Sequence, residues 1–416
     1  MTPRENLRKT LNHEEPGRVV VDFGATPVTG IHVLVVEKLR EHFGLERKPV
    51  RVHEPYQMLG EVEEDLLEAM GVDVVGISPP ADMFGNPLEH WKQWRTPWGQ
   101  EVMIPGTFTV SVDQKGDTLI YPQGDISVQP CAKMPGAAFF FDALNRQLPL
   151  IEDNLDPEDN VEEFSLLGEE DLVYWENAIG KASSGTRGVV ANFGGTGIGD
   201  IALVPALNLK APKGIRDVAD WYMSTLVRPD YLHYVFDRQT DVAIENLSRL
   251  KELAGNQVDV AYICGTDFGT QDSSFCSPET YQELYAPYYR KINHWIHEHT
   301  QWKTFKHSCG AVEPFMEHFI DSGFDIINPV QINAAGMDPG LLKDKYGERL
   351  VFWGGGADTQ KVLPFGSPEE VKTHVLRECE ILAPGGGFVF NTVHNIQANV
   401  PLRNVIAMLE AIREFG

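Results

Sequence analysis

The chain has 416 residues, of which 42% are hydrophobic, so it is long enough for one large domain or two ordinary ones with a sizeable core. Its formal net charge is −25, from 60 acidic and 35 basic residues. This charge argues against nucleic acid and anionic membrane surfaces as partners, because both need clustered lysine and arginine, and it makes a heavily anionic substrate unfavourable.

The cysteines and the N-terminal segment indicate the compartment. The five cysteines are an odd number without the spacing of a disulfide framework, which is typical of free thiols in a reducing environment. The N-terminal segment has no apolar signal core, and no run approaches the length of a membrane-spanning helix. We therefore expect a cytoplasmic protein without a membrane partner.

Short β-branched runs alternate with long amphipathic stretches along the chain. Eight buried strands, most of them followed by a helix, predict an α/β fold of the (β/α)₈ TIM barrel type. An open doubly wound sheet is the less favoured alternative, because no Gly-rich dinucleotide loop follows the first strand. The eight predicted strands are 18–23, 72–78, 188–195, 258–264, 303–308, 324–330, 350–355 and 387–393.

Residues 91–172 break this alternation. Their first part holds three tryptophans and a predicted β-hairpin between 100–106 and 115–125, and their last part, 151–172, is acidic. We interpret residues 91–172 as an insertion between the second and third barrel strands. We expect the insertion to pack either on the barrel or on a second subunit. The second arrangement would make the protein a homodimer. Residues 1–416 then form a single barrel domain with this insertion.

Polar side chains gather where the predicted strands end. The active sites of such barrels lie at the C-terminal ends of the strands. Any one of these residues could simply form a turn, but their convergence on one rim indicates a functional site. They are Asp22, Asn192, Asp267, Gln271, His307, Cys309, Asn328, Gln331, Asp358, Gln360, His394 and Gln397.

His307 and Cys309 end the fifth predicted strand. Residues i and i+2 of a strand face the same way, so both side chains can reach one ion. A buried cysteine beside a hydrogen-bonded histidine is the plain alternative. Nucleophilic catalysis by Cys309 is another, but Cα atoms roughly 6–7 Å apart are far for a direct hydrogen bond. A zinc ion, with bonds of about 2.0–2.3 Å to nitrogen and sulfur, spans that gap.

Catalytic zinc typically has three protein ligands and one open position. The third ligand should come from another strand end, and His394, Asp267 and Cys264 are the candidates. We favour His394, a neutral imidazole in a loop rich in asparagine and glutamine. Cys264 lies inside a strand run and is expected to be a core residue.

Several segments together resemble a known family. They include DFGTQ (267–271), FKHSCGAVEPFMEHFIDSGFDIINPVQ (305–331) and PGGGFVFNTVHNIQANVPLRNVIAML (384–409). These segments, with the N-terminal RENLRKTLNHEEPGRVVVDFG, resemble the uroporphyrinogen decarboxylase superfamily and, within it, its cobamide-dependent methyltransferase branch, with O-demethylases as the nearest type. The resemblance covers about two thirds of the chain. It implies a barrel that binds a thiol or a methyl donor near zinc and works against a corrinoid.

The chain departs from this family at two places. True uroporphyrinogen decarboxylases carry an arginine-rich stretch after the first strand, where this chain has VDFGATPVTGIH (21–32) without arginine. Several substrate carboxylates could not be desolvated there at tolerable cost. Members that methylate thiols have a later cysteine in a PGCG-like segment, where this chain has Gly386. His394, eight residues downstream, could replace that ligand, which favours demethylation of small substrates, notably aryl methyl ethers.

The resemblance and the residues together predict a zinc-dependent methyltransferase. It would pass a methyl group from a small methylated substrate to cobalamin on a separate corrinoid protein, because the chain lacks the D-x-H-x-x-G signature of a cobalamin module. Asp267 is the expected catalytic acid, and Asn192, Gln271, Gln331 and Gln397 are expected to bind the substrate. The insertion's tryptophans could stack on its ring. The alternatives are a barrel that binds a corrinoid or another small molecule without methyl transfer, and a uroporphyrinogen-type decarboxylase.

Overall fold

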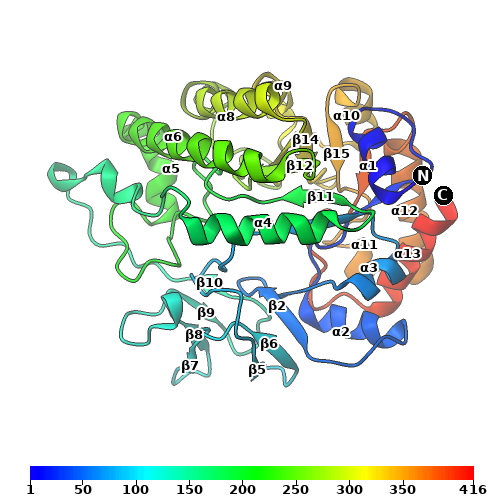
Figure 1. Ribbon diagram of the computed structural model, residues 1–416, viewed down its shortest axis with the longest axis horizontal. Helices are drawn as coiled ribbons and strands as arrows, with labels where there is room; N and C mark the ends of the chain where they lie inside the picture. The colour runs from blue at the N-terminus through cyan, green and yellow to red at the C-terminus, as the bar shows by residue number, and fades with distance from the viewer.

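The computed structural model describes residues 1–416, and a parallel eight-stranded sheet forms its centre (Figure 1). The sheet order is β1-β16-β15-β14-β13-β12-β11-β4. The backbone N–H of Asp73 donates to the carbonyl of Val21 at 2.8 Å, so the two outermost strands also meet and the sheet curls into a barrel. Its strands are β1 (Val20–Val21), β4 (Val74–Ile77), β11 (Gly188–Ala191), β12 (Val260–Cys264), β13 (Lys303–His307), β14 (Ile326–Asn328), β15 (Val351–Trp353) and β16 (Phe388–Phe390).

These eight strands lie within the eight runs predicted from the sequence, so the barrel prediction is confirmed and the open sheet is wrong. The β1–β4 seam depends on Asp73, whose buried carboxylate accepts the N–H of Val21 at 2.8 Å and pairs with Arg18 at 2.6 Å. Beyond the seam, the chain after β1 crosses β4 at Gly76. A Cβ on Gly76 would overlap the carbonyl oxygen of Ala25, so only glycine fits at this position.

Helices surround the sheet as an outer layer (Figure 1). Ser277 and Ser367 cap helices as their Ser-Pro-Glu motifs predict: Ser277 Oγ accepts the N–H of Thr280, and Ser367 Oγ accepts that of Glu370. None of the helices combines the length and hydrophobicity that a membrane span needs. The helices are α1 (Pro3–Leu11), α2 (Val33–His42), α3 (Glu64–Met70), α4 (Glu169–Ser183), α5 (Val218–Val227), α6 (Pro229–Ala254), α7 (Pro278–Thr280), α8 (Ala286–His299), α9 (Met316–Asp321), α10 (Pro339–Tyr346), α11 (Val362–Phe365), α12 (Pro368–Leu382) and α13 (Leu402–Phe415).

Residues between β4 and β11 form strands outside the barrel, as predicted, and these strands lie together on one side of it (Figure 1). They join two small sheets. The first has the order β3-β2-β6-β5, from β2 (Val50–Glu54), β3 (Leu59–Gly60), β5 (Lys92–Arg95) and β6 (Glu101–Ile104). The second has the order β10-β9-β8-β7, from β7 (Val110–Val112), β8 (Thr118–Ile120), β9 (Ala132–Met134) and β10 (Asp142–Ala143). The first sheet thus recruits β2 and β3 from the chain between α2 and α3.

The predicted hairpin between 100–106 and 115–125 is wrong in its pairing. Both segments contain strands, but β6 pairs with β5, and β8 pairs with β7 and β9. Tight turns between neighbours decide this, because Thr96 Oγ1 accepts the N–H of Gln100 and Asp113 Oδ1 accepts the N–H of Asp117. The last residues of the acidic segment, from Glu169 onward, form the first turn of α4.

One cluster of buried apolar residues runs through the barrel and its helical layer. Phe108, Met134 and Phe141 of the inserted segment belong to this same cluster. The insertion therefore packs on its own barrel through apolar contacts.

Candidate metal centre

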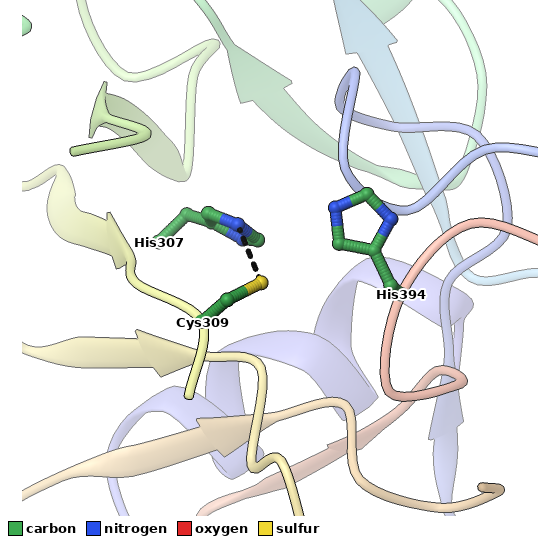
Figure 2. Close-up of side chains that lie close together, drawn as sticks. All are labelled: His307, Cys309 and His394. Carbon is green, nitrogen blue, oxygen red and sulfur yellow. Dashed lines mark hydrogen bonds between the residues drawn. The ribbon is translucent and has the colours of Figure 1, made fainter. Parts of the chain in front are cut away.

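The end of β13 and the loops after β13 and β16 bring His307, Cys309 and His394 together (Figure 2). One ligand atom from each residue lies within 4.8 Å of those of the other two. Cys309 Sγ is 3.3 Å from Nε2 of His307, and the two imidazole rings lie 5.5 Å apart between centroids at 74°. The structure thus assembles the three residues that the sequence predicts as metal ligands.

The close contact between Cys309 and His307 corrects one expectation. Strand spacing suggested that their side chains would be too far apart for a direct hydrogen bond, but Cys309 lies beyond the end of β13. There the chain turns at Gly310, where φ is +89°, and the thiol of Cys309 points toward the imidazole of His307. Burial and the charge of Asp267 raise the pKa of Cys309 well above its usual range. A nucleophile and a zinc ligand both need the thiolate, so this raised pKa does not separate the two roles, and a bound cation would favour the thiolate.

Asn328, the last residue of β14, orients the imidazole of His307. Its Oδ1 lies 2.6 Å from Nδ1 of His307, while its Nδ2 donates to the carbonyl of Trp353 at 2.7 Å. An amide oxygen can only accept, so Nδ1 of His307 carries the proton. The lone pair of Nε2 then points toward Cys309, which is the arrangement that a metal-binding histidine needs.

Burial sets the charge state of the cluster. It lowers the pKa of His307 to about 4, and it lowers the pKa of His394 to about 4 together with the positive charge that His307 would carry. Both imidazoles are therefore neutral at pH 7 and keep a free lone pair. Two imidazole nitrogens and one sulfur fit a borderline-soft ion such as zinc, with a fourth position left for a substrate.

Asp267, in the loop after β12, touches this cluster. Its Oδ1 accepts the backbone N–H of Cys309 at 2.6 Å and lies 3.7 Å from Nε2 of His307. Burial raises the pKa of Asp267, although the hydrogen bond from the N–H of Cys309 and the charge of Lys306 oppose that rise. Asp267 is thus placed to orient Cys309 or to exchange a proton near it. Cys264 is buried within β12 and does not join the cluster.

Gln271 and Gln331 link the loops beside Cys309. Gln331 Oε1 accepts the backbone N–H of Gly310 at 2.7 Å, and Gln331 Nε2 donates to Gln271 Oε1 at 3.2 Å. Gln360 also reaches Gln271 Oε1, at 3.4 Å. The side-chain amides of Gln271, Gln331 and Gln360 are linked by hydrogen bonds, and Gln331 also binds the backbone of Gly310. Together they position the loop that carries Cys309.

Asn192 and Gln397 lie at strand ends but share no hydrogen bond with the cluster. Asn192 Oδ1 accepts the N–H of Gly194 at 3.3 Å, as a turn former does. The backbone carbonyl of Gln397 accepts the N–H of Val400 at 3.1 Å, and its side chain is half-buried. Their predicted role in substrate binding stays a prediction.

The insertion's tryptophans contact side chains of the protein itself. Trp98 packs against His32 and Phe139 with ring centroids 5.5 Å and 5.3 Å apart, and Trp94 packs against Phe108 at 5.4 Å. These contacts stabilise the insertion, and stacking on a substrate ring stays a prediction.

Two polar residues beside the cluster escaped the sequence-based prediction. Lys306 is fully buried; its Nζ donates to the carbonyls of Thr266 and His307 at 2.6 Å and 2.8 Å and lies 4.9 Å from the ring centre of Phe268. Its only signal is a lysine inside an apolar strand. Asp200 accepts the N–H of Gly265 at 3.0 Å, and its pKa is raised by burial and by the charge of Asp267.

Comparisons with known proteins place the chain in a family. Residues 206–415, half of the chain, match the family model described as uroporphyrinogen decarboxylase (URO-D). Among solved structures, a methyltransferase from Methanosarcina mazei has a similar fold, with a TM-score of 0.55 and 15% sequence identity over 100% of this chain and 99% of that chain. No curated protein matches the chain. The matched region contains His307, Cys309 and His394, and the chain belongs to the uroporphyrinogen decarboxylase family.

Proposed function

We propose that this chain is a zinc-dependent methyltransferase that moves a methyl group from a small methylated substrate, an aryl methyl ether, to a corrinoid on a partner protein. The observation that carries this proposal is the convergence of His307, Cys309 and His394 within 4.8 Å at one end of the barrel. The fold shared with the Methanosarcina methyltransferase supports it.

The donor atoms that would hold zinc are Nε2 of His307, Sγ of Cys309 and one ring nitrogen of His394. When bound, zinc supplies Lewis-acid stabilisation of the charge that develops on the leaving oxygen. An imidazole in place of a second thiolate leaves the site one unit more positive, which suits an ether oxygen better than a thiol nucleophile.

Asp267 is the residue that we assign to proton transfer. Its raised pKa makes it a better proton carrier near neutral pH than an exposed carboxyl group, and it touches the ligand residues Cys309 and His307. As the methyl carbon leaves for the corrinoid, the bond between carbon and oxygen breaks and both its electrons stay on oxygen. That oxygen takes the proton of Asp267 and departs as a phenol.

The charge around the cluster argues against uroporphyrinogen-type decarboxylation. The chain after β1 has no arginine over residues 22–32, and the Nζ of Lys306 is occupied by two carbonyl oxygens. A substrate with several carboxylates would lose its hydration there without gaining cationic partners. A barrel that binds a corrinoid without methyl transfer is the alternative that the experiment must separate.

The test uses zinc-loaded protein, cob(I)alamin and a panel of methoxylated aromatics and methylamines. We expect formation of methylcobalamin, followed by its absorbance, with at least one methoxylated aromatic. The Cys309→Ala variant should give none. Zinc-loaded protein that binds cobalamin but transfers no methyl group from any panel member would favour the binding alternative.

A further inference from the structure

The hydroxyl of Tyr222, on α5, is buried and has no hydrogen-bond partner in the protein. Tyrosines of the neighbouring helices differ: the hydroxyl of Tyr231 donates to Asn160 Oδ1 at 2.6 Å, and that of Tyr289 donates to the carbonyl of Ile198 at 2.8 Å. Buried polar groups in native proteins nearly always have a partner. The hydroxyl of Tyr222 is therefore free to donate to a partner from outside the chain.

Tyr222 lies against the loop that carries Asp267. Its ring stacks on that of Phe275, with centroids 4.7 Å apart and planes at 14°. The backbone N–H of Phe275 donates to the carbonyl of Phe268 at 2.8 Å, and Phe268 directly follows Asp267. Asp267 in turn accepts the N–H of Cys309, so a short chain of contacts joins Tyr222 to the candidate metal centre.

The surroundings of Tyr222 keep its hydroxyl protonated. Burial raises its pKa above the ordinary range, and the negative charges of Asp267, Cys276 and Asp200 add to that rise. The two carboxylates already accept backbone N–H groups, from Cys309 and from Ala202 and Gly265. Tyr222 is thus a hydrogen-bond donor close enough to Asp267 and Asp200 for their charges to act on it, and its hydroxyl has no acceptor in the protein.

We propose that Tyr222 is a substrate-binding residue whose hydroxyl donates a hydrogen bond to the oxygen of the bound aryl methyl ether. This inference rests on the proposed function and gives a structural reason why the substrate would be an ether. The ether oxygen has a lone pair that accepts this bond, and the bond strengthens as the oxygen gains charge. A methylammonium nitrogen has no lone pair, so Tyr222 selects ethers over methylated ammonium ions.

The test compares the wild type with Tyr222→Phe, which removes the hydroxyl and keeps the ring on Phe275. Tyr231→Phe is the matched control, since it removes a hydroxyl bonded within the protein. Two properties are measured: the Kd for phenol by calorimetry without corrinoid, and kcat/KM for para-substituted methoxybenzenes with cob(I)alamin. We expect Tyr222→Phe to weaken phenol binding about 10-fold and to lower kcat/KM about 10- to 100-fold. The loss should grow as the leaving phenol becomes less acidic, and Tyr231→Phe should change neither property.

The outcomes separate this inference from the proposed function. If Tyr222→Phe binds phenol as tightly as the wild type, or loses the same factor for every leaving phenol, the role of Tyr222 is wrong while methyl transfer can stand. If the wild type transfers no methyl group, the proposed function fails. The phenol Kd values of the wild type and Tyr222→Phe then decide alone whether the hydroxyl of Tyr222 forms a hydrogen bond with the oxygen of a bound phenol. Wild-type protein that does not bind phenol overturns the inference.

Discussion

Nδ1 of His307 lies 2.6 Å from Oδ1 of Asn328, so the residue that ends β14 holds the imidazole that ends β13. Asn328 is itself held by the carbonyl of Trp353 at the end of β15. Three adjacent strands thus fix the tautomer and direction of one candidate ligand. Such partners of metal-binding histidines raise metal affinity by restricting the ring.

Replacing Asn328 should weaken zinc binding without removing a ligand. Asn328→Ala leaves Nδ1 of His307 without its acceptor, and we expect a 10- to 100-fold loss of zinc affinity. Competition with a chelating indicator measures this. Asn404→Ala is the matched control, because Asn404 is also fully buried and donates to two backbone carbonyls away from the site. Equal zinc affinities in the two variants would contradict the role of Asn328.

His394→Ala tests the third ligand. We expect zinc affinity to fall by a factor on the order of 10–100, or more if the imidazole binds the ion directly, and methyl transfer to be lost. His374→Ala serves as the control, since His374 is a half-buried histidine that accepts the N–H of Asp358. If zinc binding and turnover both survive the loss of His394, that residue only shapes the loop and Asp267 becomes the next candidate ligand.

Asp267→Asn should separate proton transfer from metal binding. The amide oxygen of asparagine can still accept the N–H of Cys309, so zinc should stay bound. The proton is lost, and we expect kcat for methyl transfer to fall about 10²- to 10⁴-fold. The loss should shrink for methoxybenzenes whose phenols are acidic, because those oxygens leave without a proton. Loss of zinc from this variant would instead make Asp267 a ligand.

The buried carboxyl group of Asp22 should make the free energy of unfolding depend on pH. Its carboxylate accepts the indole N–H of Trp353 at 2.9 Å, and burial raises its pKa from 3.8 to about 6. The folded state therefore binds more protons than the unfolded state between these values, and stability falls as pH rises through this window. The shift corresponds to about 3 kcal/mol above pH 6. Burial also raises the pKa of Glu54, Asp73 and Asp82, so part of the fall remains in any Asp22 variant. Urea unfolding from pH 4 to 7 should therefore show a fall about 3 kcal/mol smaller in Asp22→Asn than in the wild type. An equal fall in both proteins would show that Asp22 is not its cause.

Local sequence signals were enough to predict the barrel and the three residues that the structure brings together at its rim. Alternating apolar runs and helical periodicity depend on neighbouring residues, so all eight strands could be found. His307 and Cys309 share a face by strand geometry, and His394 follows from the convergence of strand ends on one rim. The pairing of β6 with β5 could not be predicted, because turn chemistry at Thr96 competed with longer-range alternatives.

Other parts of the site depend on contacts that no local pattern encodes. Tyr222 comes from a helix that precedes β12, and only the fold places it beside the loop of Asp267. Lys306 looks like a surface lysine in the sequence, yet two carbonyls and several aromatic rings allow its burial. Such partners lie far apart in the chain and become visible only in three dimensions.

The zinc content of purified protein tests the central claim most directly. Elemental analysis of protein prepared without chelator should give about one zinc per chain for the wild type and for Cys276→Ala, which removes a half-exposed thiol outside the ligand set. Cys309→Ala should lose the zinc while keeping its circular dichroism spectrum. Full zinc retention in folded Cys309→Ala would contradict the site formed by His307, Cys309 and His394.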